Sequence, residues 1–354
     1  MRSMAEPLRI GILNDLSATS PGPSGITEWL RIACDELTGN ADNGRIDRPV
    51  EFMHASGLGL PFGTAAAVER AYRSLVEQDA LLIVGPAIGD NALVATPLAE
   101  HHCVPTLNWA GSERARGQYM FHLQVGSHED ESIVLARHCA ACGSRRLGVV
   151  SDRSPIGRRH LTFLQAEAEI LGLPIAATAS VTPLASNAEV EVGSLLASNI
   201  DALIYLGLGV SAPAVARAAR AQGYDGLRAM NTAGLRGYAA EFAQLIDGWV
   251  YVDMFADDNQ TLLKLRQRLQ LPAVRSLAAA KGYDLGRLVA EALARAPERT
   301  RDGVREGLEQ IKWLPAAEGY EGTLLGFGRY DRGALHGRYL VLRQWRNGES
   351  VQVE

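Results

Sequence analysis

Cysteine is the most reactive side chain in this 354-residue sequence, and two of the four cysteines have the spacing of a redox motif. Cys139-Ala-Ala-Cys142 follows His138 and precedes Gly143. A redox pair acts at the start of a helix, where the helix dipole lowers the thiol pKa. A glycine directly after the pair instead indicates a helix end. We therefore favour two small helix residues over a redox site or a disulfide framework.

The other candidate chemical groups lack the partners that catalysis requires. His101 and His102 adjoin at an expected helix end, without metal-ligand spacing to a second pair. The sequence has neither a Gly-x-Ser-x-Gly nucleophile elbow nor a Walker loop. Gly207-Leu-Gly209 follows an apolar run, but Ala212 stands where a dinucleotide fingerprint has its third glycine. We predict no catalytic residue, no metal site and no cofactor, and we expect that the protein is not an enzyme.

Composition makes several partner classes improbable. The net charge is −5, and the acidic and basic residues are interspersed without a basic patch, which disfavours nucleic acid and anionic membranes as partners. The chain is 47% hydrophobic and 21% charged, as in ordinary packed proteins. We find no apolar run of about 18 residues, so we expect no membrane insertion.

The elements that must position any site form a repeated β–α pattern in the first third of the chain. Short apolar runs predict strands, and amphipathic stretches between them predict helices. The expected strands are 8–13, 50–54, 81–84 and 104–108, and the expected helices are 28–37, 64–78 and 91–101. Repeated units of this kind form a parallel sheet covered by helices on both faces.

The β–α pattern starts again near residue 125. The expected strands are 146–150, 175–178, 202–205, 229–231 and 248–252, and the expected helices are 129–142, 158–171, 189–198, 212–222 and 239–245. Two long helices, 276–296 and 300–311, then precede a β-prone tail over 322–351. The sequence therefore predicts an α/β protein with two Rossmann-like lobes, each built on a parallel central sheet.

This order of elements resembles the type I periplasmic binding fold, and within it the branched-chain amino acid (leucine/isoleucine/valine-type) solute-binding proteins of ABC transporters. The resemblance covers essentially the whole chain. Its local matches are Ile10-Gly-Ile-Leu13, Leu82-Ile-Val-Gly-Pro86, Val104-Pro-Thr-Leu-Asn-Trp-Ala-Gly-Ser112, Val149-Val-Ser-Asp152 with Gly157, Tyr283-Asp284, and Gly326-Phe-Gly with Gly337-Arg-Tyr and Gln344-Trp-Arg-Asn-Gly348. Each match is weak alone, and their order and spacing carry the assignment.

The resemblance implies a three-stranded hinge, with crossings between the lobes near Val125, Phe255 and Asp331. Lobe one is then expected to comprise residues 1–124 plus 256–331, and lobe two residues 125–255 plus 332–354. The ligand is expected in the cleft between the lobes, outside the C-terminal ends of the strands.

In lobe one, the resemblance implies two ligand-binding loops. The first contributes Gly89, Asp90 and Asn91, and the second contributes Asn108, Trp109, Ala110 and Ser112. Gly89 occupies the position of the family's key serine, whereas Ala110 and Ser112 match its backbone-and-hydroxyl pair. A helix begins after the first loop, so an anionic or oxygen-rich ligand group is expected there. The alternative to ligand binding is a helix-capping role for Asp90 and a packed core position for Trp109.

In lobe two, the sequence departs from the amino-acid binders. The acidic residue that pairs with the ligand ammonium corresponds to Ala233, close to Asn231, and the aromatic positions correspond to Ile156 and Leu208. An ammonium taken from water without a counter-charge is costly. We therefore expect an aromatic acid, an amide or another weakly polar metabolite rather than a standard α-amino acid. Ser20 and Trp29 complete the expected contacts.

Two binding functions remain open on this fold. The first is a solute receptor that captures its ligand by hinge closure and delivers it to ABC transporter permease subunits. The second is a cytosolic sensor similar to the amide-responsive regulator of amidase expression, with a regulatory protein as its partner. The receptor is expected in the periplasm if an export leader was removed. The sensor is expected in the cytoplasm if Met1 is the native start.

Overall fold

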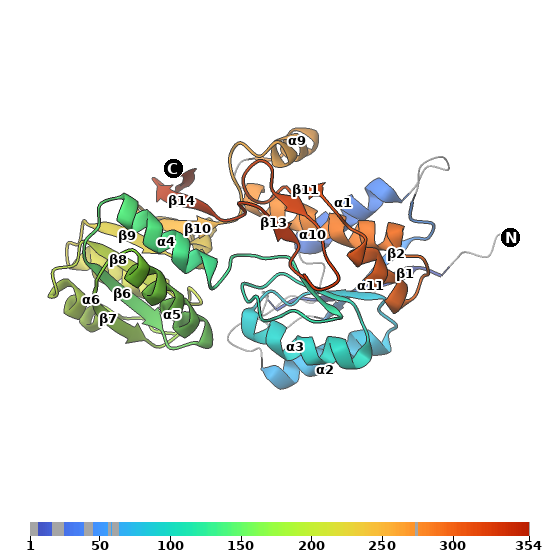
Figure 1. Ribbon diagram of the computed structural model, residues 1–354, viewed down its shortest axis with the longest axis horizontal. Helices are drawn as coiled ribbons and strands as arrows, with labels where there is room; N and C mark the ends of the chain where they lie inside the picture. The colour runs from blue at the N-terminus through green and yellow to red at the C-terminus, as the bar shows by residue number, and fades with distance from the viewer. Residues whose placement is uncertain are drawn as a thin grey trace. The chain divides into compact units, whose positions relative to one another are not determined.

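The computed structural model divides the chain into two compact units, whose elements are labelled in Figure 1. Unit 1 comprises Met1–Val125 and Phe255–Tyr339, and unit 2 comprises Gly126–Met254 and Leu340–Glu354. The structure describes residues 6–15, 25–38, 45–55, 58, 64–272 and 275–353. The chain thus passes between the units three times.

The third crossing lies further along the chain than the sequence suggested. Residues 332–339 were expected in lobe two, but they belong to unit 1. His122 donates its main-chain N–H to the Arg332 carbonyl (2.9 Å), and Ala334 donates to the His122 carbonyl (2.8 Å). The expected boundary at Asp331 is therefore wrong, because main-chain pairing that spans about 200 residues of sequence holds this segment in unit 1.

The large sheet of unit 1 has five parallel strands in the order β2-β1-β3-β4-β5. Its strands are β1 (Leu8–Leu13), β2 (Val50–Ala55), β3 (Leu82–Val84), β4 (Thr106–Asn108) and β5 (Met120–His122). β5 was not predicted, because only three of its residues pair with β4, and because the bridge from His122 on its other side is to Gly333, which lies far along the chain.

Helices cover both faces of this sheet. Figure 1 shows α2 (Ala65–Glu77) and α3 (Gly89–His102) on one face, and α1 (Gly25–Leu37), α10 (Ser276–Arg295) and α11 (Arg301–Glu309) on the other. Two hydrophobic clusters match these faces, one with α1 and α10 side chains and one with α2 and α3 side chains. Unit 1 also contains α9 (Gln260–Leu269) and a small antiparallel sheet of β11 (Leu314–Pro315), β12 (Leu324–Leu325) and β13 (Leu335–His336).

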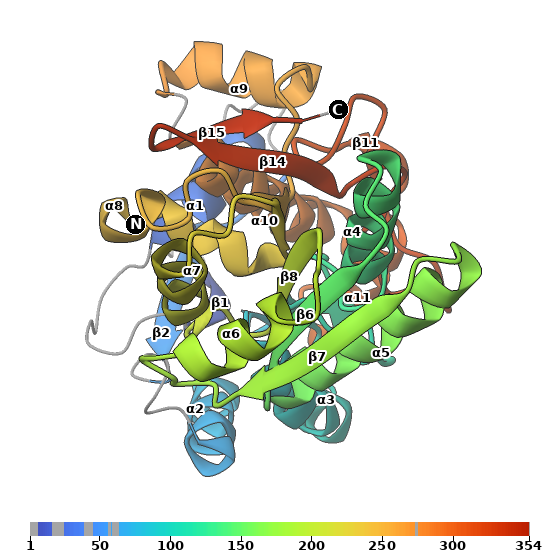
Figure 2. The same ribbon diagram turned by 90° about the vertical axis from the view of Figure 1, so that its left-hand side faces the viewer.

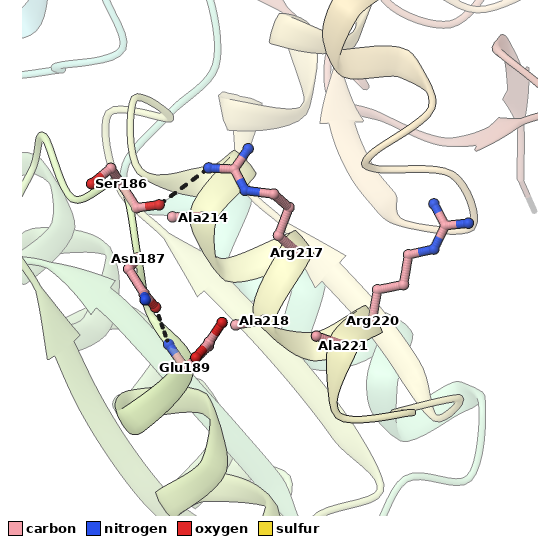
Figure 3. Close-up of a pocket in the computed structure, with 8 residues that line it drawn as sticks. All are labelled: Ser186, Asn187, Glu189, Ala214, Arg217, Ala218, Arg220 and Ala221. Atoms are coloured by element: carbon pink, nitrogen blue, oxygen red, sulfur yellow. Dashed lines mark hydrogen bonds between the residues drawn. The ribbon is translucent and has the colours of Figure 1, made fainter.

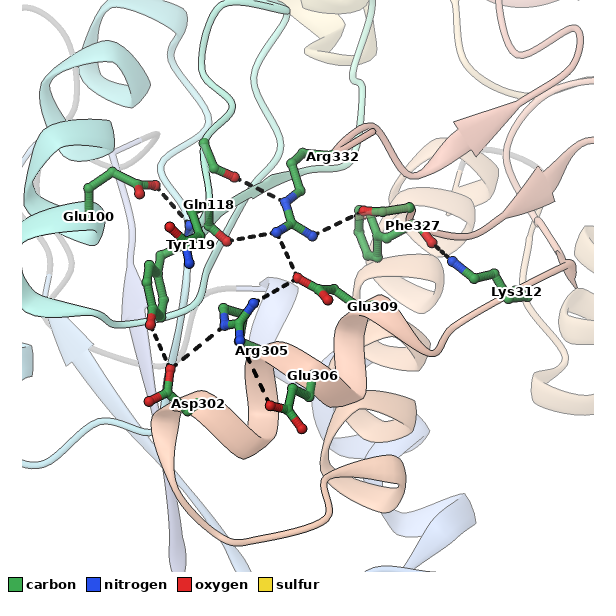
Figure 4. A network of polar contacts seen from close by, with 12 residues as sticks. Glu100, Gln118, Tyr119, Asp302, Arg305, Glu306, Glu309, Lys312, Phe327 and Arg332 are labelled. Atoms are coloured by element: carbon green, nitrogen blue, oxygen red, sulfur yellow. Dashed lines mark hydrogen bonds and ion pairs between the residues drawn. The ribbon is translucent and has the colours of Figure 1, made fainter. Parts of the chain in front are cut away.

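A polar network joins α11 to the end of unit 1 (Figure 4). Arg332, only 5% exposed, donates to the Glu309 carboxylate (2.7 Å) and to the carbonyls of Gly117 and Gln118 (both 3.1 Å). Arg305 binds the same Glu309 oxygen (2.9 Å). The network therefore ties the segment before β13 to α11 and to the loop before β5 with charge-assisted hydrogen bonds.

The sheet of unit 2 has seven strands in the order β15-β14-β10-β9-β8-β6-β7. The parallel strands are β6 (Leu147–Asp152), β7 (Ile175–Val181), β8 (Ala202–Leu206), β9 (Leu227–Met230) and β10 (Val250–Asp253). The tail supplies β14 (Val341–Arg346) and β15 (Glu349–Gln352), which pair antiparallel. Parallel pairs thus dominate both large sheets, and the predicted α/β fold class is confirmed.

Helices also flank the sheet of unit 2. Figure 2 shows α4 (Asp130–Ala141) and α5 (Pro155–Ile170) on one face, and α6 (Glu189–Leu196) and α7 (Ala212–Ala221) on the other. The 3₁₀ segment η1 (Thr232–Tyr238) and the short α8 (Ala240–Ala243) connect β9 to β10. α5 begins three residues before the predicted start at 158, because Ser154 caps it and accepts the Gly157 N–H (3.0 Å).

Candidate ligand-binding residues in the two units

In unit 1, the two predicted loops leave neighbouring parallel strands at the same edge of the sheet. The first loop follows β3, and the second follows β4. The Gly85 N–H donates to the Leu107 carbonyl (2.8 Å), and the Trp109 N–H donates to the Pro86 carbonyl (3.2 Å). These hydrogen bonds hold the starts of both loops together at the carboxyl ends of the strands, where ligands of open α/β sheets bind.

The first loop is fixed by Asp15, a residue that sequence reasoning missed. Its carboxylate accepts the main-chain N–H of Ala87 (2.8 Å) and Ile88 (2.9 Å) and the side-chain amide of Asn91 (3.0 Å). Burial raises the pKa of Asp15 above its usual value, and these hydrogen bonds oppose the shift. An acidic residue two positions after a predicted strand was the available signal.

Asp15 changes the expectation for the start of α3. An anionic or oxygen-rich ligand group was expected there, but the carboxylate of Asp15 already binds the N–H groups of Ala87 and Ile88. Gly89 and Asp90 are the first two residues of α3, and Asp90 places its negative charge in the first turn. Ile88, not Asp90, stands at the N-cap position.

The second loop is held by Asn108, whose polar atoms are used within the protein. Its amide nitrogen donates to the carbonyls of Ala115 (2.9 Å) and Phe121 (2.8 Å), and its oxygen accepts the Ala110 N–H (3.2 Å). The Ala110 carbonyl lies 2.5 Å from His122 Nε2. Asn108 and Ala110 therefore maintain the shape of the loop.

Trp109 and Ser112 are both buried in this loop, with 3% and 2% of their surface exposed. The Trp109 ring belongs to the main hydrophobic cluster of unit 1, as its alternative role required. However, its indole N–H is buried and has no hydrogen-bond partner among the described residues. A buried donor without a partner is unfavourable, which sets the Trp109 indole N–H apart from the other polar groups of the loop.

In unit 2, Asp152 fixes the loop that carries Leu208. Its carboxylate accepts the N–H groups of Leu208 (2.7 Å) and Ser154 (3.1 Å), and the Ser154 hydroxyl also donates to it. Ile156 lies in the first turn of α5, with 7% of its surface exposed. Leu208 and Ile156 thus lie in segments that the same buried carboxylate joins.

Asn231 directly follows β9, and its polar atoms also have partners inside the unit. Its amide nitrogen donates to the Gly207 carbonyl (2.9 Å), and its oxygen accepts the Gly207 N–H (3.3 Å). The same nitrogen lies 3.1 Å from Nε2 of His160, which is fully buried. Burial lowers the pKa of His160 well below its usual value, so the ring is neutral and Nε2 accepts.

Ala233 lies in η1, 5% exposed, against the loop that follows β8. A Cβ placed on Gly209 would lie 3.1 Å from Ala233. The preceding Thr232 donates its N–H to the buried carboxylate of Glu131 (2.7 Å), whose other oxygen accepts the Ser127 N–H (2.7 Å). Ala233 thus presents only a methyl group here, and Glu131 holds the backbone beside it.

Trp29 serves helix packing, whereas Ser20 lies outside the described residues. Trp29 is 2% exposed in α1, and a Cβ on Gly282 of α10 would lie 2.4 Å from its Cδ1 atom. Cys139 is buried and Cys142 exposed, and both are free thiols. Burial raises the pKa of Cys139 to about 12, which disfavours the reactive thiolate.

Within the described ranges, no group of three or more His, Cys, Asp or Glu side chains is arranged to hold a metal ion. None of the helices described has the length and apolar character needed to cross a bilayer.

A hollow of about 490 Å³ lies elsewhere on unit 2, along α6 and α7 (Figure 3). Arg217 donates across it to the Ser186 carbonyl (3.2 Å). The lining residues are Ser186, Asn187, Glu189, Ala214, Arg217, Ala218, Arg220 and Ala221. None of the predicted ligand contacts is among them, so we do not assign this hollow to the site.

Comparison with known proteins agrees with the architecture. The chain resembles solved structures of a leucine-binding protein LivK from Thermotoga maritima MSB8 (TM-score 0.80, 17% identity, 98% of each chain), an extracellular ligand-binding receptor from Rhodopseudomonas palustris HaA2 (0.77, 21%, 99% of this chain and 100% of that one), and an ABC transporter substrate-binding protein from Desulfitobacterium hafniense (0.78, 16%, 98% and 100%). At these identities the likeness shows the fold.

Among curated proteins, none matches this chain. The sequence model of one family, described as periplasmic binding protein, matches residues 7–348. That match spans nearly the whole chain, including both units and all three crossings. The chain belongs to the periplasmic binding protein family.

Proposed function

We propose that this protein is a solute receptor that captures a small organic molecule by hinge closure and delivers it to the permease subunits of an ABC importer. The family match over residues 7–348 supports a binding function, and one structural neighbour is described as an ABC transporter substrate-binding protein. In both units, loops at the carboxyl ends of parallel strands carry the predicted contacts, which is where open α/β sheets bind ligands.

We further propose that the ligand lacks an α-ammonium group. The observation that carries this proposal is Ala233, buried at the position expected to hold a counter-charge. Ile156 and Leu208 offer only apolar side chains, so a bound ammonium would lose its hydration without compensation. An aromatic acid, an amide or another weakly polar metabolite avoids this loss. The Trp109 indole N–H can donate to an oxygen of such a ligand.

The occupied start of α3 favours an amide over an acid. Asp15 already uses the N–H groups of Ala87 and Ile88. A ligand carboxylate placed near them would meet a second carboxylate of like charge rather than free donors. Among ligands that share one carbon skeleton, we therefore expect the amino acid to bind most weakly, the acid more tightly and the amide most tightly.

Thermal unfolding with two matched series tests this order. The series are L-leucine, 4-methylpentanoate and 4-methylpentanamide, and L-phenylalanine, 3-phenylpropanoate and 3-phenylpropanamide. Preferential binding to the folded state raises the unfolding temperature. We expect the largest increase with an amide and little or none with either amino acid. The matched variant Ala233→Glu should gain a response to L-leucine, because it restores an acidic partner.

A large shift of wild-type protein with L-leucine would contradict the ligand class. Nuclear magnetic resonance of the incubated mixtures provides a second check. Unchanged compounds are expected for a receptor, whereas steady formation of a product would contradict a binding function.

A further inference from the structure

The two units share an internal arrangement of four parallel strands. In unit 1 the order is β2-β1-β3-β4, and in unit 2 the order is β7-β6-β8-β9. In each unit, the first strand therefore lies between the second and the third, and the fourth lies beyond the third. Positions in β1, β3 and β4 can be compared directly with positions in β6, β8 and β9.

An aspartate stands at the carboxyl end of the first strand in both units. Asp15 comes two residues after β1, and Asp152 is the last residue of β6. Both side chains have 0% of their surface exposed. Each accepts main-chain N–H groups from the loop after the third strand: Asp15 from Ala87 and Ile88, and Asp152 from Leu208 (2.7 Å).

A glycine follows the third strand in each unit and permits the close approach. A Cβ on Gly85 would lie 2.3 Å from the Leu13 carbonyl oxygen, and a Cβ on Gly207 would lie 2.2 Å from the carboxylate of Asp152. No other residue type fits these distances without displacement of the backbone or of the buried carboxylate. The loop after the third strand is thus pressed against the end of the first strand in both units.

We infer that Asp15 and Asp152 are positioning residues of the same kind, each of which holds the loop after the third strand of its unit in the shape that meets the ligand, although Asp152 corresponds in strand register to Leu13 and Asp15 lies two residues further on. The part of this inference that concerns the ligand rests on the proposed function. A carboxylate that accepts main-chain N–H groups forms charge-assisted hydrogen bonds and fixes the direction of the loop amides. The loop after β8 contains Leu208, and the loop after β3 leads directly into Gly89 at the start of α3; both residues are predicted ligand contacts.

Asp284 provides a matched control for simple stability. It is a buried aspartate of α10 that accepts the N–H groups of Ala317 (2.8 Å) and Glu318 (3.0 Å). Like Asp15 and Asp152 it accepts main-chain N–H groups, although it also pairs with Arg287 (3.5 Å), and the loop that it holds contains no predicted ligand contact. Loss of Asp284 should therefore lower stability without changing ligand affinity.

The experiment compares Asp15→Asn, Asp152→Asn and Asp284→Asn by amide hydrogen exchange and by binding of 3-phenylpropanamide. Asparagine keeps the size but turns one acceptor into a donor, which cannot accept an N–H. We expect Asp15→Asn to accelerate exchange in residues 85–91, Asp152→Asn in 207–211, and Asp284→Asn in 315–319. Unchanged exchange in both of the first two loops would overturn the inference.

The binding measurement separates positioning from stability. We expect Asp15→Asn and Asp152→Asn to weaken the binding of 3-phenylpropanamide by at least about tenfold, which corresponds to about 1.4 kcal/mol. The affinity is measured at a temperature where each variant is folded. Asp284→Asn should stay within about twofold, and an equal loss in all three variants would overturn a positioning role. If wild-type protein does not bind this probe, the proposed ligand class is wrong, whereas exchange still decides whether the loops depend on these aspartates.

Milder variants cover the case that Asp15→Asn or Asp152→Asn does not fold. Asn91→Ala removes only one donor to Asp15, and Ser154→Ala removes the hydroxyl donor to Asp152. Each should accelerate exchange in the loop of its own unit and leave the other loop unchanged. The same exchange rate as wild type in both variants would count against the inference.

Discussion

At the scale of single residues, the predicted ligand contacts differ in how far the protein already uses their polar atoms. Asn108 and Asn231 each form three hydrogen bonds within their own units. Trp109 instead has an indole N–H without a partner in the described part of the chain. Side chains of the first kind shape the loops, and the buried donor of the second kind is the one that we propose for recognition.

Trp109→Phe should separate recognition from stability. The change removes a donor that has no partner, so we expect little loss of stability but about tenfold weaker binding of 3-phenylpropanamide. Tyr72→Phe is the control, because the buried Tyr72 hydroxyl forms a hydrogen bond with the Thr106 hydroxyl (2.7 Å) away from the predicted contacts. The control should lower the free energy of unfolding by about 1 kcal/mol and preserve affinity. Equal binding by wild type and Trp109→Phe would refute this role.

Also at the residue scale, the buried side chain of His128 predicts how the stability of the protein depends on pH. Burial lowers the pKa of His128 to about 4, whereas an unfolded histidine titrates near 6.5. The unfolded chain therefore binds more protons between these values, so this contribution to stability is present above pH 6.5 and is lost as the pH falls towards 4. Asp284, whose pKa burial raises to about 6, acts in the opposite direction.

His128→Gln isolates the histidine contribution. Relative to this variant, wild-type protein should lose up to about 3 kcal/mol of unfolding free energy between pH 6.5 and pH 4. Urea denaturation at several pH values measures the difference. The variant His101→Gln, changed at an exposed position, should follow the wild-type curve. Parallel curves for wild type and His128→Gln would disprove the assignment.

At the scale of elements, the sequence was most informative where local patterns decide the structure. The parallel strands of both large sheets other than β5 follow apolar runs, and most of the helices follow amphipathic stretches. β5 and the segment 332–339 were misjudged because long-range contacts place them. Asp15 was missed for the same reason, since its partners Ala87 and Ile88 lie more than 70 residues further along the chain.

The network around Arg332 should contribute strongly to the stability of unit 1. Arg332→Met leaves the Glu309 carboxylate and three carbonyls without this buried donor, and we expect a loss of about 3 kcal/mol in unfolding free energy. Arg329→Met is the control, because the Arg329 guanidinium stacks on Tyr330, which is 90% exposed. Equilibrium unfolding of both variants tests the difference, and comparable losses would argue against a structural role for the network.

At the scale of the whole molecule, the residue pattern predicted the architecture, whereas the family resemblance predicted the candidate site. The succession of β–α units predicted two lobes with parallel sheets, and the structure has this architecture in both units. The candidate site depended on family resemblance, residue by residue. That resemblance identified Ala233 as a departure, but it could not show that Asp15 and Asp152 bind the two loops, because such contacts depend on the folded register of the strands.

Small-angle X-ray scattering with a matched ligand pair tests the central claim most directly. The claim is that a solute without an α-ammonium group drives closure of this receptor. We predict that saturating 3-phenylpropanamide decreases the radius of gyration, because closure shifts the population towards a more compact state. L-phenylalanine at the same concentration should leave the radius unchanged. A decrease with L-phenylalanine and none with 3-phenylpropanamide would contradict the account.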